Sequence, residues 1–367
     1  MGQIINRIYY TYKDVTIEPC VITDIEHREE CNPYYEDGFL PLFTAPMDTV
    51  INKNNFSLFK ENKINAILPR TETLEDRINY ATSGNWAAFS LKEFEDLFCG
   101  KENKKFDVTV AIKVLIDVAN GHMKKIAELV SIAKEVYGNN IIIMAGNIAN
   151  PQAYYAYAKC GIDYVRVGIG GGKGCITSTC LGVHMPMASL INDISIIKEG
   201  LSPTFYKSIP KIVADGGIRG YADIMKSLAL GADYAMIGSV FARMLESAAP
   251  KYSDLLSGEI DRGNFKYMYL QDGKWMLEDE EVGNICATFY GMASRQGQIA
   301  MKGAKTKTSE GTSKCLSVDY KMDGWCKNFT DYLCSTMSYV GVRDLERFKK
   351  DSVLIINSQN AVNVVNK

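Results

Sequence analysis

Eight short apolar runs recur along the first two thirds of this chain, and longer stretches with helical periodicity separate them. Apolar residues spaced three and four apart, as in 123–137 and 222–230, are typical of helices that pack one face against a sheet. Eight strands that alternate with helices over about 200 residues predict a parallel (β/α)8 barrel, an α/β fold. A doubly wound sheet would usually show fewer strands and an early GxGxxG motif, which is absent. The expected strands are 42–44, 64–68, 86–90, 114–117, 141–145, 164–167, 211–214 and 234–237.

The rest of the chain flanks or follows this predicted core. The arm before it is polar and rich in tyrosine, and we expect it to be irregular. The insertion after it is polar and dotted with glycine, with one expected hairpin, 265–277, that turns at Asp272-Gly273. Such an insertion is either disordered or an active-site flap, and its motif FYGMAS favours the flap. The predicted division is an N-terminal arm (1–40), a barrel core (41–248), the insertion (249–320) and a C-terminal helix with an extended tail (321–367).

Composition excludes several classes of protein. A formal net charge of −2 gives no general basic field, which disfavours a nucleic-acid-binding protein. No window approaches the roughly 18 apolar residues of a membrane-spanning helix. The ten cysteines are scattered without CxxC pairs, and the N-terminus lacks an apolar signal region, so we expect a cytoplasmic protein. His27, His122 and His184 have no metal-ligand spacing, which argues against a zinc site.

One stretch, YVRVGIGGGKGCIT at 164–177, contains a candidate catalytic residue. A short apolar strand leads into a loop with four glycines that ends at Cys175. Glycine is used where the backbone needs positive φ or must approach a ligand closely. Such a loop can present a thiol as a nucleophile to a flat or phosphorylated substrate. The alternative is a glycine-rich turn with a buried structural cysteine, and this stretch alone does not decide between the two.

Glycine turns follow the last two expected strands. Gly216 and Gly217 come after one strand, and Gly238 and Ser239 follow the next at the start of a short helix. In barrels of this type, backbone N–H groups at these two positions often bind phosphate. Asp215 directly precedes the first turn and could accept hydrogen bonds from ribose hydroxyls. Each turn alone could be an ordinary tight turn, but the pair together favours a phosphate monoester.

Asp117 ends another expected strand, on the opposite side of the barrel mouth. A second ligand could stack there. Alternatively, Asp117 only caps the helix that begins near His122. The residues leave these two interpretations open.

With these residues identified, the chain resembles the IMP dehydrogenase and GMP reductase family. The resemblance extends from YKDVTIEP (12–19) to the tail and covers nearly the whole chain. So many blocks in the right order are hard to obtain by chance. The matching blocks are APMDTV (45–50), IDVANGH (116–122), AGNI (145–148), VGIGGGKGCIT (167–177), ADGGIR (214–219), ALGADYAMIGS (229–239) and FYGMAS (289–294).

Within the family, three features favour a GMP reductase. No regulatory insertion of about 120 residues, as many dehydrogenases carry, interrupts the barrel core. The block IDVANG is similar to the reductase version of that motif. The dehydrogenases use an Arg-Tyr pair in the flap to activate water, and the sequence between Tyr290 and Glu310 has no Arg-Tyr pair.

The resemblance implies a role for each site residue. Cys175 would attack C2 of GMP, and Thr177 with Glu310 would handle the proton for the departing ammonia. The implied substrate-binding residues are Asp215, Gly216, Gly217, Gly238, Ser239, Met292, Ala293 and Met47. The implied cofactor-binding residues are Asp117, Ala119, Asn147 and Arg70, with NADPH as the hydride donor.

Further family properties follow as expectations. Carbonyl groups of Gly170, Gly172 and Cys175 would form a binding loop for a monovalent cation such as K+. A homotetramer is expected, because such barrels complete their mouths with residues of a neighbour. No membrane or nucleic-acid partner is expected.

The sequence departs from the family pattern at Gly171, Ser178 and Pro69, and residues 249–287 form a longer segment than usual. These departures keep open a catalytically idle purine-nucleotide-binding barrel. The motifs APMDTV and GCIT fit a short NAD⁺-dependent IMP dehydrogenase as well as they fit a reductase. A phosphate-binding flavin barrel is the third alternative.

Overall fold

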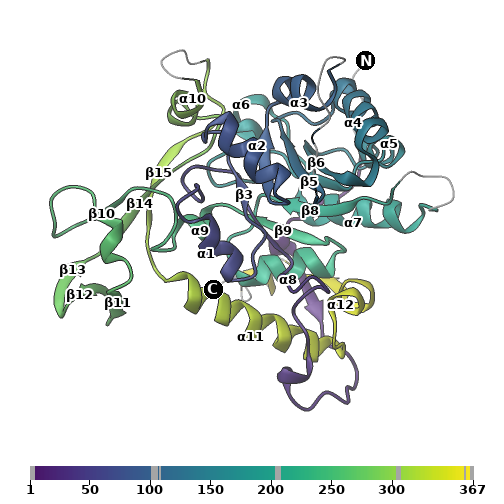
Figure 1. Cartoon of the computed structure of the whole chain (residues 1–367). Helices are drawn as coiled ribbons and strands as arrows, with labels where there is room; N and C mark the ends of the chain where they lie inside the picture. The colour runs from purple at the N-terminus through teal and green to yellow at the C-terminus, as the bar shows by residue number, and fades with distance from the viewer. Residues whose placement is uncertain are drawn as a thin grey trace.

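The eight expected strands form one parallel sheet in the computed structural model of the chain (Figure 1). The structure describes residues 5–100, 106, 109–202, 208–302, 307–358 and 361–363. Along the sheet the strands are ordered β2-β9-β8-β7-β6-β5-β4-β3. They are β2 (Leu42–Thr44), β3 (Ile67–Leu68), β4 (Trp86–Phe89), β5 (Ile112–Asp117), β6 (Ile141–Ile148), β7 (Tyr164–Val167), β8 (Lys211–Asp215) and β9 (Tyr234–Ile237).

The two edge strands, β2 and β3, meet and close the sheet. Phe43 forms a parallel bridge with Asn65, and Asn65 exchanges backbone hydrogen bonds with Leu42 and Thr44. The hydroxyl of Thr44 accepts a further bond from the amide of Ile67 at 2.9 Å. The predicted (β/α)8 barrel is therefore confirmed.

Helices alternate with the strands and cover the outside of the barrel (Figure 1). In α4 the buried residues Ile126, Leu129, Val130 and Ala133 follow the helical spacing that the sequence shows. They pack into the large core between sheet and helices. The helices are α1 (Phe56–Glu61), α2 (Leu74–Thr82), α3 (Leu91–Phe98), α4 (Lys124–Tyr137), α5 (Ala153–Cys160), α6 (Thr177–Leu181), α7 (Met187–Glu199), α8 (Tyr221–Ala229) and α9 (Ser239–Ala242).

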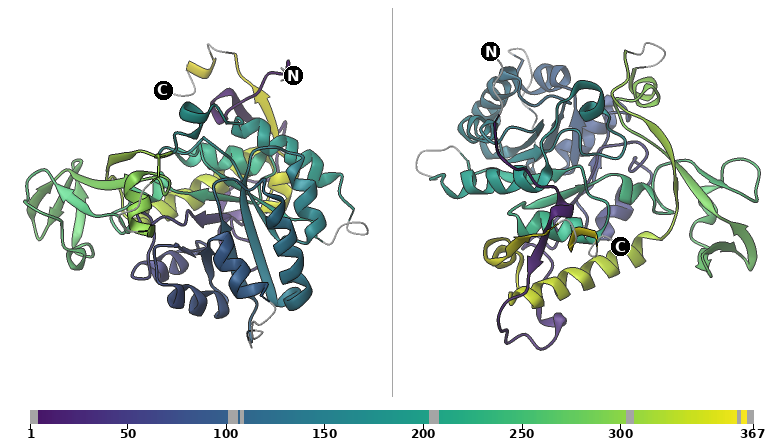
Figure 2. Two further views of the ribbon diagram at one scale, coloured as in Figure 1. Left: turned by 90° about the horizontal axis from the view of Figure 1, so that it is seen from above. Right: turned by 180° about the vertical axis from the view of Figure 1, so that it is seen from behind.

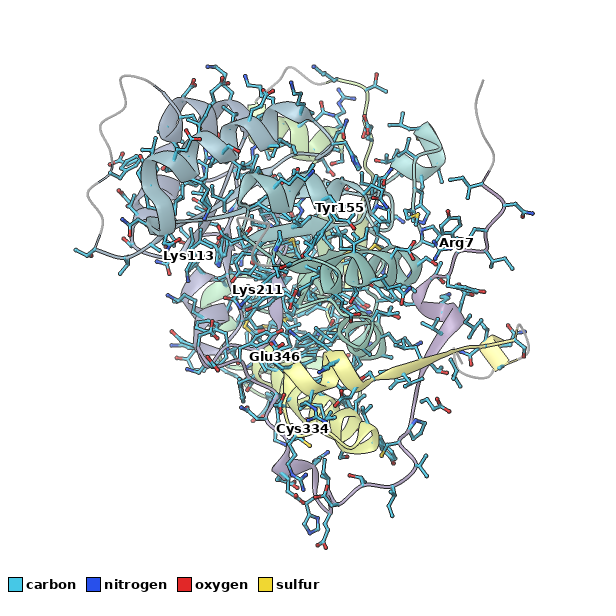
Figure 3. The ribbon with its side chains drawn as sticks, turned by 90° about the vertical axis from the view of Figure 1, so that its right-hand side faces the viewer. Arg7, Lys113, Tyr155, Lys211, Cys334 and Glu346 are labelled. Atoms are coloured by element: carbon cyan, nitrogen blue, oxygen red, sulfur yellow. A yellow bond between two sulfur atoms is a disulfide. The ribbon has the colours of Figure 1, made fainter. Side chains whose placement is uncertain are left out.

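A second core fills the inside of the barrel with aromatic and large apolar side chains, among them Phe43, Trp86 and Tyr234. Edge-to-face contacts join these rings, with the centroids of Phe43 and Tyr234 4.9 Å apart. The ammonium of Lys211 lies over the rings of Tyr164 and Tyr234, 5.6 Å from each centroid. Figure 3 labels Lys211 near the middle of the molecule. The barrel is thus packed at this end, which leaves the opposite end for a site.

The described residues of the insertion form strands and a helix, and most of these strands project away from the barrel (Figures 1 and 2). The expected hairpin is confirmed, with its turn at Asp272 and Gly273, both of which have positive φ. The sequence pattern did not predict the remaining strands or the small core around the buried Trp275. The sheets have the orders β11-β12-β13 and β10-β14-β15. The elements are β10 (Lys251–Ser253), β11 (Met268–Gln271), β12 (Lys274–Leu277), β13 (Glu280–Gly283), β14 (Ile285–Tyr290), α10 (Arg295–Lys302) and β15 (Ser313–Ser317).

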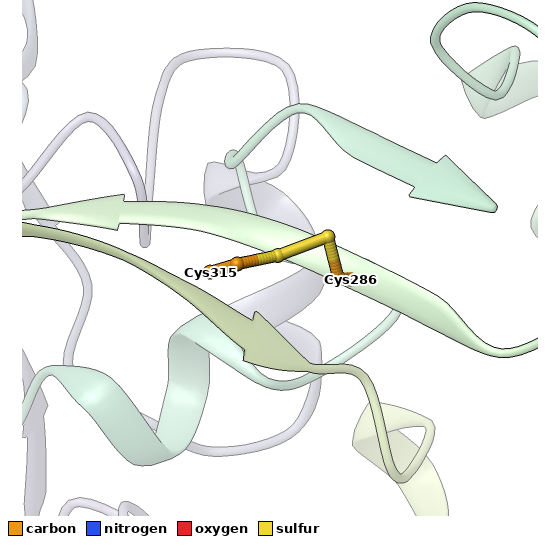
Figure 4. The surroundings of a disulfide bond; sticks show 2 residues. All are labelled: Cys286 and Cys315. Atoms are coloured by element: carbon orange, nitrogen blue, oxygen red, sulfur yellow. A yellow bond between two sulfur atoms is a disulfide. The ribbon is translucent and has the colours of Figure 1, made fainter. Parts of the chain in front are cut away.

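A disulfide joins Cys286 on β14 to Cys315 on β15 (Figure 4). The spacing of the cysteines in the sequence did not predict this pairing. The other eight cysteines form no disulfide. Of the ten scattered cysteines, this pair is the one that the structure joins.

Strand β1 (Val15–Glu18), near the N-terminus, pairs antiparallel with β16 (Val353–Ile356), near the C-terminus (Figure 2). This pairing corrects the expectation of a wholly irregular N-terminal arm. Before β16, the expected helical extension forms α11 (Met322–Val340) and α12 (Leu345–Asp351). Arg7 anchors the first described residues through two hydrogen bonds to Asp193, on the far side of the molecule from Lys113 (Figure 3). No helix in the described part of the chain is long and apolar enough to cross a membrane.

Candidate active site

A cavity of about 330 Å³ opens at the carboxyl ends of the barrel strands, where (β/α)8 barrels carry their chemistry. This volume lies in the range of small-molecule sites. Most residues singled out in the sequence line it, together with residues that the sequence did not indicate. The predicted residues in the lining are Met47, Arg70, Asp117, Ala119, Gly172, Cys175, Asp215, Gly216, Gly217, Gly238, Ser239, Met292, Ala293 and Glu310.

The glycine-rich loop after β7 packs directly against the insertion. The amide of Thr312 donates to the carbonyl of Gly174 at 3.0 Å. A Cβ atom at Gly174 would lie 2.9 Å from the backbone nitrogen of Gly291, too close for any side chain. The lack of a side chain at Gly174 therefore allows the insertion to reach the barrel mouth.

Cys175, Thr177 and Glu310 form a chain of polar contacts. The Sγ atom of Cys175 lies 3.2 Å from the hydroxyl oxygen of Thr177. That hydroxyl in turn lies 3.5 Å from a carboxylate oxygen of Glu310, at the limit for a hydrogen bond. The amide of Ile176 donates to the carbonyl of Glu310 at 3.0 Å and so fixes the two segments side by side. A thiol, a hydroxyl and a carboxylate thus meet, although 133 positions separate Thr177 from Glu310.

Cys175 lies in the cavity wall and is half-buried, with its thiol free. A structural cysteine would be enclosed in apolar packing, as Cys326 is in α11. Burial raises the pKa of the Cys326 thiol to about 12, which keeps it protonated and inert. The position of Cys175 therefore favours the nucleophile over the structural alternative.

The two glycine turns line the same cavity as Cys175. Gly216 and Gly217 have φ of 107° and 78°, values that glycine adopts without strain. Gly238 and Ser239 lie on the neighbouring strand end, because β8 and β9 pair in parallel. The four residues thus share one side of the mouth, as the sequence predicted.

A buried arginine, Arg166 on β7, ties the two sides of the mouth together. Its guanidinium contacts a carboxylate oxygen of Asp117 at 2.9 Å and one of Asp215 at 3.1 Å. It also donates to the amide oxygen of Asn147 at 2.5 Å, and the Asn147 amide group donates to Asp215 at 2.8 Å. Burial raises the pKa of Asp215, and the positive charge of Arg166 opposes that shift. Asn147 does not line the cavity, so it acts on the site by orienting Asp215.

Asp117 does not cap the following helix. The residue before α4 is Met123, and no side chain caps this helix. Asp117 instead pairs with Arg166 and lies 3.8 Å from the guanidinium of Arg70, which also donates to its backbone carbonyl at 3.2 Å. The structure therefore supports the interpretation of Asp117 as a residue of the site.

Several lining residues were missed from the sequence. Arg166 could have been noticed as the one charge within an apolar strand, because a buried charge needs partners. Lys173 and Arg219 follow glycines of the two predicted loops and also line the cavity. No local signal pairs Tyr290 with Asp48, whose contact joins segments 242 positions apart.

The expected cation loop does not present three free carbonyl groups. The carbonyl of Gly172 accepts from the amide of Cys175 at 3.0 Å, and that of Gly170 accepts from the hydroxyl of Ser178 at 3.3 Å. Within the described residues, no cluster of histidine, cysteine and acidic side chains could hold a metal ion. A monovalent cation remains a prediction, and no chemistry below depends on it.

Comparison with known proteins gives the family. The sequence pattern described as "IMP dehydrogenase / GMP reductase domain" matches residues 101–364. The chain is 27% identical over 365 residues to a GMP reductase of Mesoplasma florum, covering 96% of this chain and 99% of that protein. It is 30% identical over 318 residues to a GMP reductase of Staphylococcus epidermidis, covering 81% and 92% respectively.

A dehydrogenase is similar over a shorter region. The chain is 33% identical over 239 residues to an inosine-5'-monophosphate dehydrogenase of Chlorobaculum parvum, which is 65% of this chain and 44% of that protein. The chain thus spans less than half of that dehydrogenase but nearly the whole length of the two reductases. The matched domain covers most of the chain and contains Cys175 and both glycine turns. This chain therefore belongs to the IMP dehydrogenase / GMP reductase family of oxidoreductases.

Proposed function

We propose that this protein is a GMP reductase, which converts GMP to IMP and ammonia. The observation that carries the proposal is the contact chain from Cys175 through Thr177 to Glu310 at the barrel mouth. This series of contacts brings a nucleophile and a proton path to the same point of the cavity. The Arg-Tyr pair that a dehydrogenase would need to activate water does not occur between Tyr290 and Glu310 in the sequence. Two relatives named GMP reductase, which match over most of their length, support the same choice.

The glycine turns would bind the 5'-phosphate of GMP. Backbone N–H groups of Gly216, Gly217, Gly238 and Ser239 would face the phosphate oxygens. Asp215 would accept hydrogen bonds from the ribose hydroxyls, since its carboxylate is held in the cavity wall by Arg166 and Asn147. The side chain of Met47 would pack against the base from the β2 end.

The flap would contact the edge of the purine. Met292 and Ala293 line the cavity beside Cys175. The amide of Glu310 donates to the carbonyl of Ala293 at 3.1 Å, which joins the flap residues to the segment that carries the carboxylate. A purine that contacts Met292 and Ala293 would therefore also lie close to Glu310.

The reaction proceeds by addition and elimination at C2. The Cys175 thiolate adds to C2 of GMP and forms the C–S bond, and the 2-amino group leaves as ammonia. Thr177 and Glu310 deliver the proton that the amino group needs in order to depart. C2 would take up the hydride that bound NADPH supplies, the C–S bond would break with its electron pair returning to sulfur, and IMP would leave with the thiolate regenerated. The overall balance consumes GMP, NADPH and two protons, and yields IMP, NADP⁺ and an ammonium ion.

The far half of the cavity suits the nicotinamide end of NADPH, which supplies the hydride when bound. Asp117, Ala119 and Arg70 line this half, and the paired charges of Asp117 and Arg70 give polar groups for a ribose. Asn147 would contribute by holding Asp215 and Arg166 in position. The residues present are thus compatible with the cofactor.

An NAD⁺-dependent IMP dehydrogenase is the second candidate, because the similarity to the Chlorobaculum parvum enzyme has the higher identity. The test mixes the purified protein separately with GMP plus NADPH and with IMP plus NAD⁺, and follows the absorbance of the reduced nicotinamide at about 340 nm. The proposal predicts loss of absorbance and release of ammonia in the first mixture only. Gain of absorbance in the second mixture alone would assign the dehydrogenase, and GMP binding without any turnover would indicate an idle barrel.

A further inference from the structure

The disulfide between Cys286 and Cys315 closes a loop that carries residues of the proposed site (Figure 4). The two cysteines are 29 positions apart, and we call the segment between them, 287–314, the flap loop. It contains the motif FYGMAS (289–294) before α10, and Glu310 after it. The bond therefore joins the two ends of the segment that would contact the purine and supply the proton.

The disulfide lies at the base of the flap loop, away from the cavity. Strands β14 and β15 pair antiparallel from Cys286 and Ser317 at one end to Tyr290 and Ser313 at the other. The motif FYGMAS and Glu310 adjoin the second end of this ladder. Neither cysteine lines the cavity. The bond can therefore hold the two strands together without taking part in the chemistry.

Hydrogen bonds hold the flap loop to the barrel. The amide of Thr312 donates to the carbonyl of Gly174 at 3.0 Å. The amide of Ile176 donates to the carbonyl of Glu310 at 3.0 Å. Segments attached by a few hydrogen bonds open locally more easily than the whole fold, and a covalent bond across the base of a loop removes many of its open conformations. The disulfide therefore favours the assembled state, in which Thr177 contacts Glu310.

One sulfur of this bond is open to solvent. Cys315 is exposed, and it lies on β15, an edge strand of the sheet β10-β14-β15. Cys286 is half-buried. An attacking thiolate needs access to a sulfur atom, so an exposed disulfide exchanges more readily than a buried one. All ten cysteines lie in the described part of the chain, and this pair forms the only disulfide among them. A disulfide reductant would therefore act on one bond of the protein.

We propose that Cys286 and Cys315 form a site of thiol–disulfide exchange, at which a dithiol reductant opens the flap loop and lowers the affinity for the purine nucleotide. The disulfide form keeps the site assembled, and the reduced form populates the assembled state only in part. The inference rests on the proposed function for the identity of the nucleotide. It goes beyond that function because a redox state of the chain sets how often the site is complete.

The reductant supplies the electrons and protons of the exchange. A thiolate of the dithiol attacks Sγ of Cys315, the S–S bond breaks, and its electron pair leaves on the sulfur of Cys286. The second thiol of the reductant then attacks the mixed disulfide and releases Cys315. The dithiol becomes an internal disulfide, and its two protons pass to the two cysteines.

Calorimetric titration of the full-length protein with GMP compares the two redox states. One sample is kept without reductant, and the other is treated with dithiothreitol. Alkylation and mass spectrometry should count eight free cysteines in the first sample and ten in the second. If the reduced flap loop is assembled about one tenth of the time, the apparent affinity falls about tenfold, and we expect a loss of this size. Turnover should fall as well, although dithiothreitol protects Cys175 from oxidation.

Three single variants separate this bond from the other thiols. Cys286→Ser and Cys315→Ser should each bind GMP as the reduced wild type does, with or without dithiothreitol. Cys20→Ser is the matched control, because Cys20 is a free, half-buried cysteine in the N-terminal arm. This variant should keep the wild-type affinity and the wild-type response to dithiothreitol. Thermal unfolding midpoints would establish that each variant folds, and the comparison of the two wild-type samples needs no variant.

Hydrogen exchange gives a readout that needs neither substrate nor turnover. On reduction, amides at 287–294 and 307–314 should exchange faster, while those of β9 should not change. Equal GMP affinity in samples with eight and with ten free cysteines would overturn the proposal, as would tighter binding on reduction. Ten free cysteines in the sample without reductant would also overturn it, because the exchange site would not exist.

Failure of this proposal is distinguishable from failure of the reductase activity. If the protein proves to be a dehydrogenase, the two redox states are compared with IMP in place of GMP. If the protein reduces GMP but both redox states bind it equally, only the redox proposal fails.

Discussion

The phenolic oxygen of Tyr290 donates a hydrogen bond to a carboxylate oxygen of Asp48 at 2.6 Å. Tyr290 ends β14 in the insertion, and Asp48 follows β2 in the barrel. The other carboxylate oxygen of Asp48 is buried with no hydrogen-bond partner in the described part of the chain. Burial raises the pKa of Asp48, and the bond from Tyr290 opposes this shift. This contact fastens the insertion to the barrel close to Met292 and Ala293, the residues proposed to contact the purine.

Tyr290→Phe removes the only hydroxyl that reaches Asp48 in the described residues. We expect KM for GMP to rise about tenfold, because a hydrogen bond to a charged group contributes roughly 1.5 to 3 kcal/mol and here holds the flap. Steady-state kinetics would measure the effect. Tyr269→Phe is the matched control, since it removes an exposed bond to Asp279 at 2.8 Å in the same insertion. Equal KM values for the two variants would show that the Tyr290 contact does not position the flap.

Glu310→Gln tests the proton path to the departing ammonia. The amide keeps the shape of the side chain but cannot deliver a proton, so kcat should fall by about 10²- to 10⁴-fold. Binding of GMP, measured by calorimetry, should change by less than about threefold, a factor that corresponds to well under 1 kcal/mol. Glu281→Gln, at an exposed position of β13, should leave both values unchanged. A matching loss of binding and turnover in Glu310→Gln would show that Glu310 only holds the substrate.

Two substitutions at Thr177 distinguish a role of its hydroxyl in the proton path from a role of the side chain in packing. Thr177→Ser retains the hydroxyl that contacts both Cys175 and Glu310, and should keep most of the activity. Thr177→Val has nearly the same volume without the hydroxyl, and kcat should fall about as far as in Glu310→Gln. Similar rates in the two Thr177 variants would remove the hydroxyl from the proton path.

The buried ammonium of Lys251 predicts that the free energy of unfolding depends on pH. Its ammonium is fully buried and donates to two oxygens of Ser247 and to the carbonyl of Ala249. Burial lowers the pKa of Lys251 to about 7, and the charge of Arg262 acts in the same direction. Above this pKa the folded chain has released a proton that the unfolded chain still binds. The free energy of unfolding therefore rises with pH between about 7 and the ordinary lysine pKa of about 10.4.

The measurement compares wild type with Lys251→Met by chemical denaturation at several pH values. The difference between their free energies of unfolding should shift in favour of the wild type by roughly 2 kcal/mol between about pH 7 and 9. Below about pH 6 the difference should be constant, because lysine is charged in both states there. A difference that stays flat across the whole range would mean that Lys251 remains charged in the folded protein.

The barrel could be predicted from the sequence because parallel strands covered on both faces read as uninterrupted apolar runs. The strand β9 (Tyr234–Ile237) is fully buried and matches the expected range. The hairpin turn at Asp272-Gly273 could also be predicted from the sequence, because both residue types tolerate positive φ. These signals are local, so a single sequence carries them.

Contacts between distant segments could not be predicted in this way. The pairing of Val15 with Ile356 joins the two ends of the chain, and local periodicity does not encode it. The disulfide between Cys286 and Cys315 depends on how two strands of the insertion align. The residues alone indicated Cys175 and the glycine turns, and the resemblance to the family supplied the role of Glu310. Neither indicated Arg166, whose role follows from its partners in space.

Cys175→Ser provides the most direct test of the account, because every step begins with addition of its sulfur to C2 of GMP. Serine preserves the size and a polar atom at this position but is a far weaker nucleophile near neutral pH. The measurement pairs calorimetric GMP binding with NADPH oxidation in the same preparation. We predict binding within a few-fold of the wild type and no detectable turnover. Turnover by Cys175→Ser at a rate near that of the wild type would contradict covalent catalysis at this thiol.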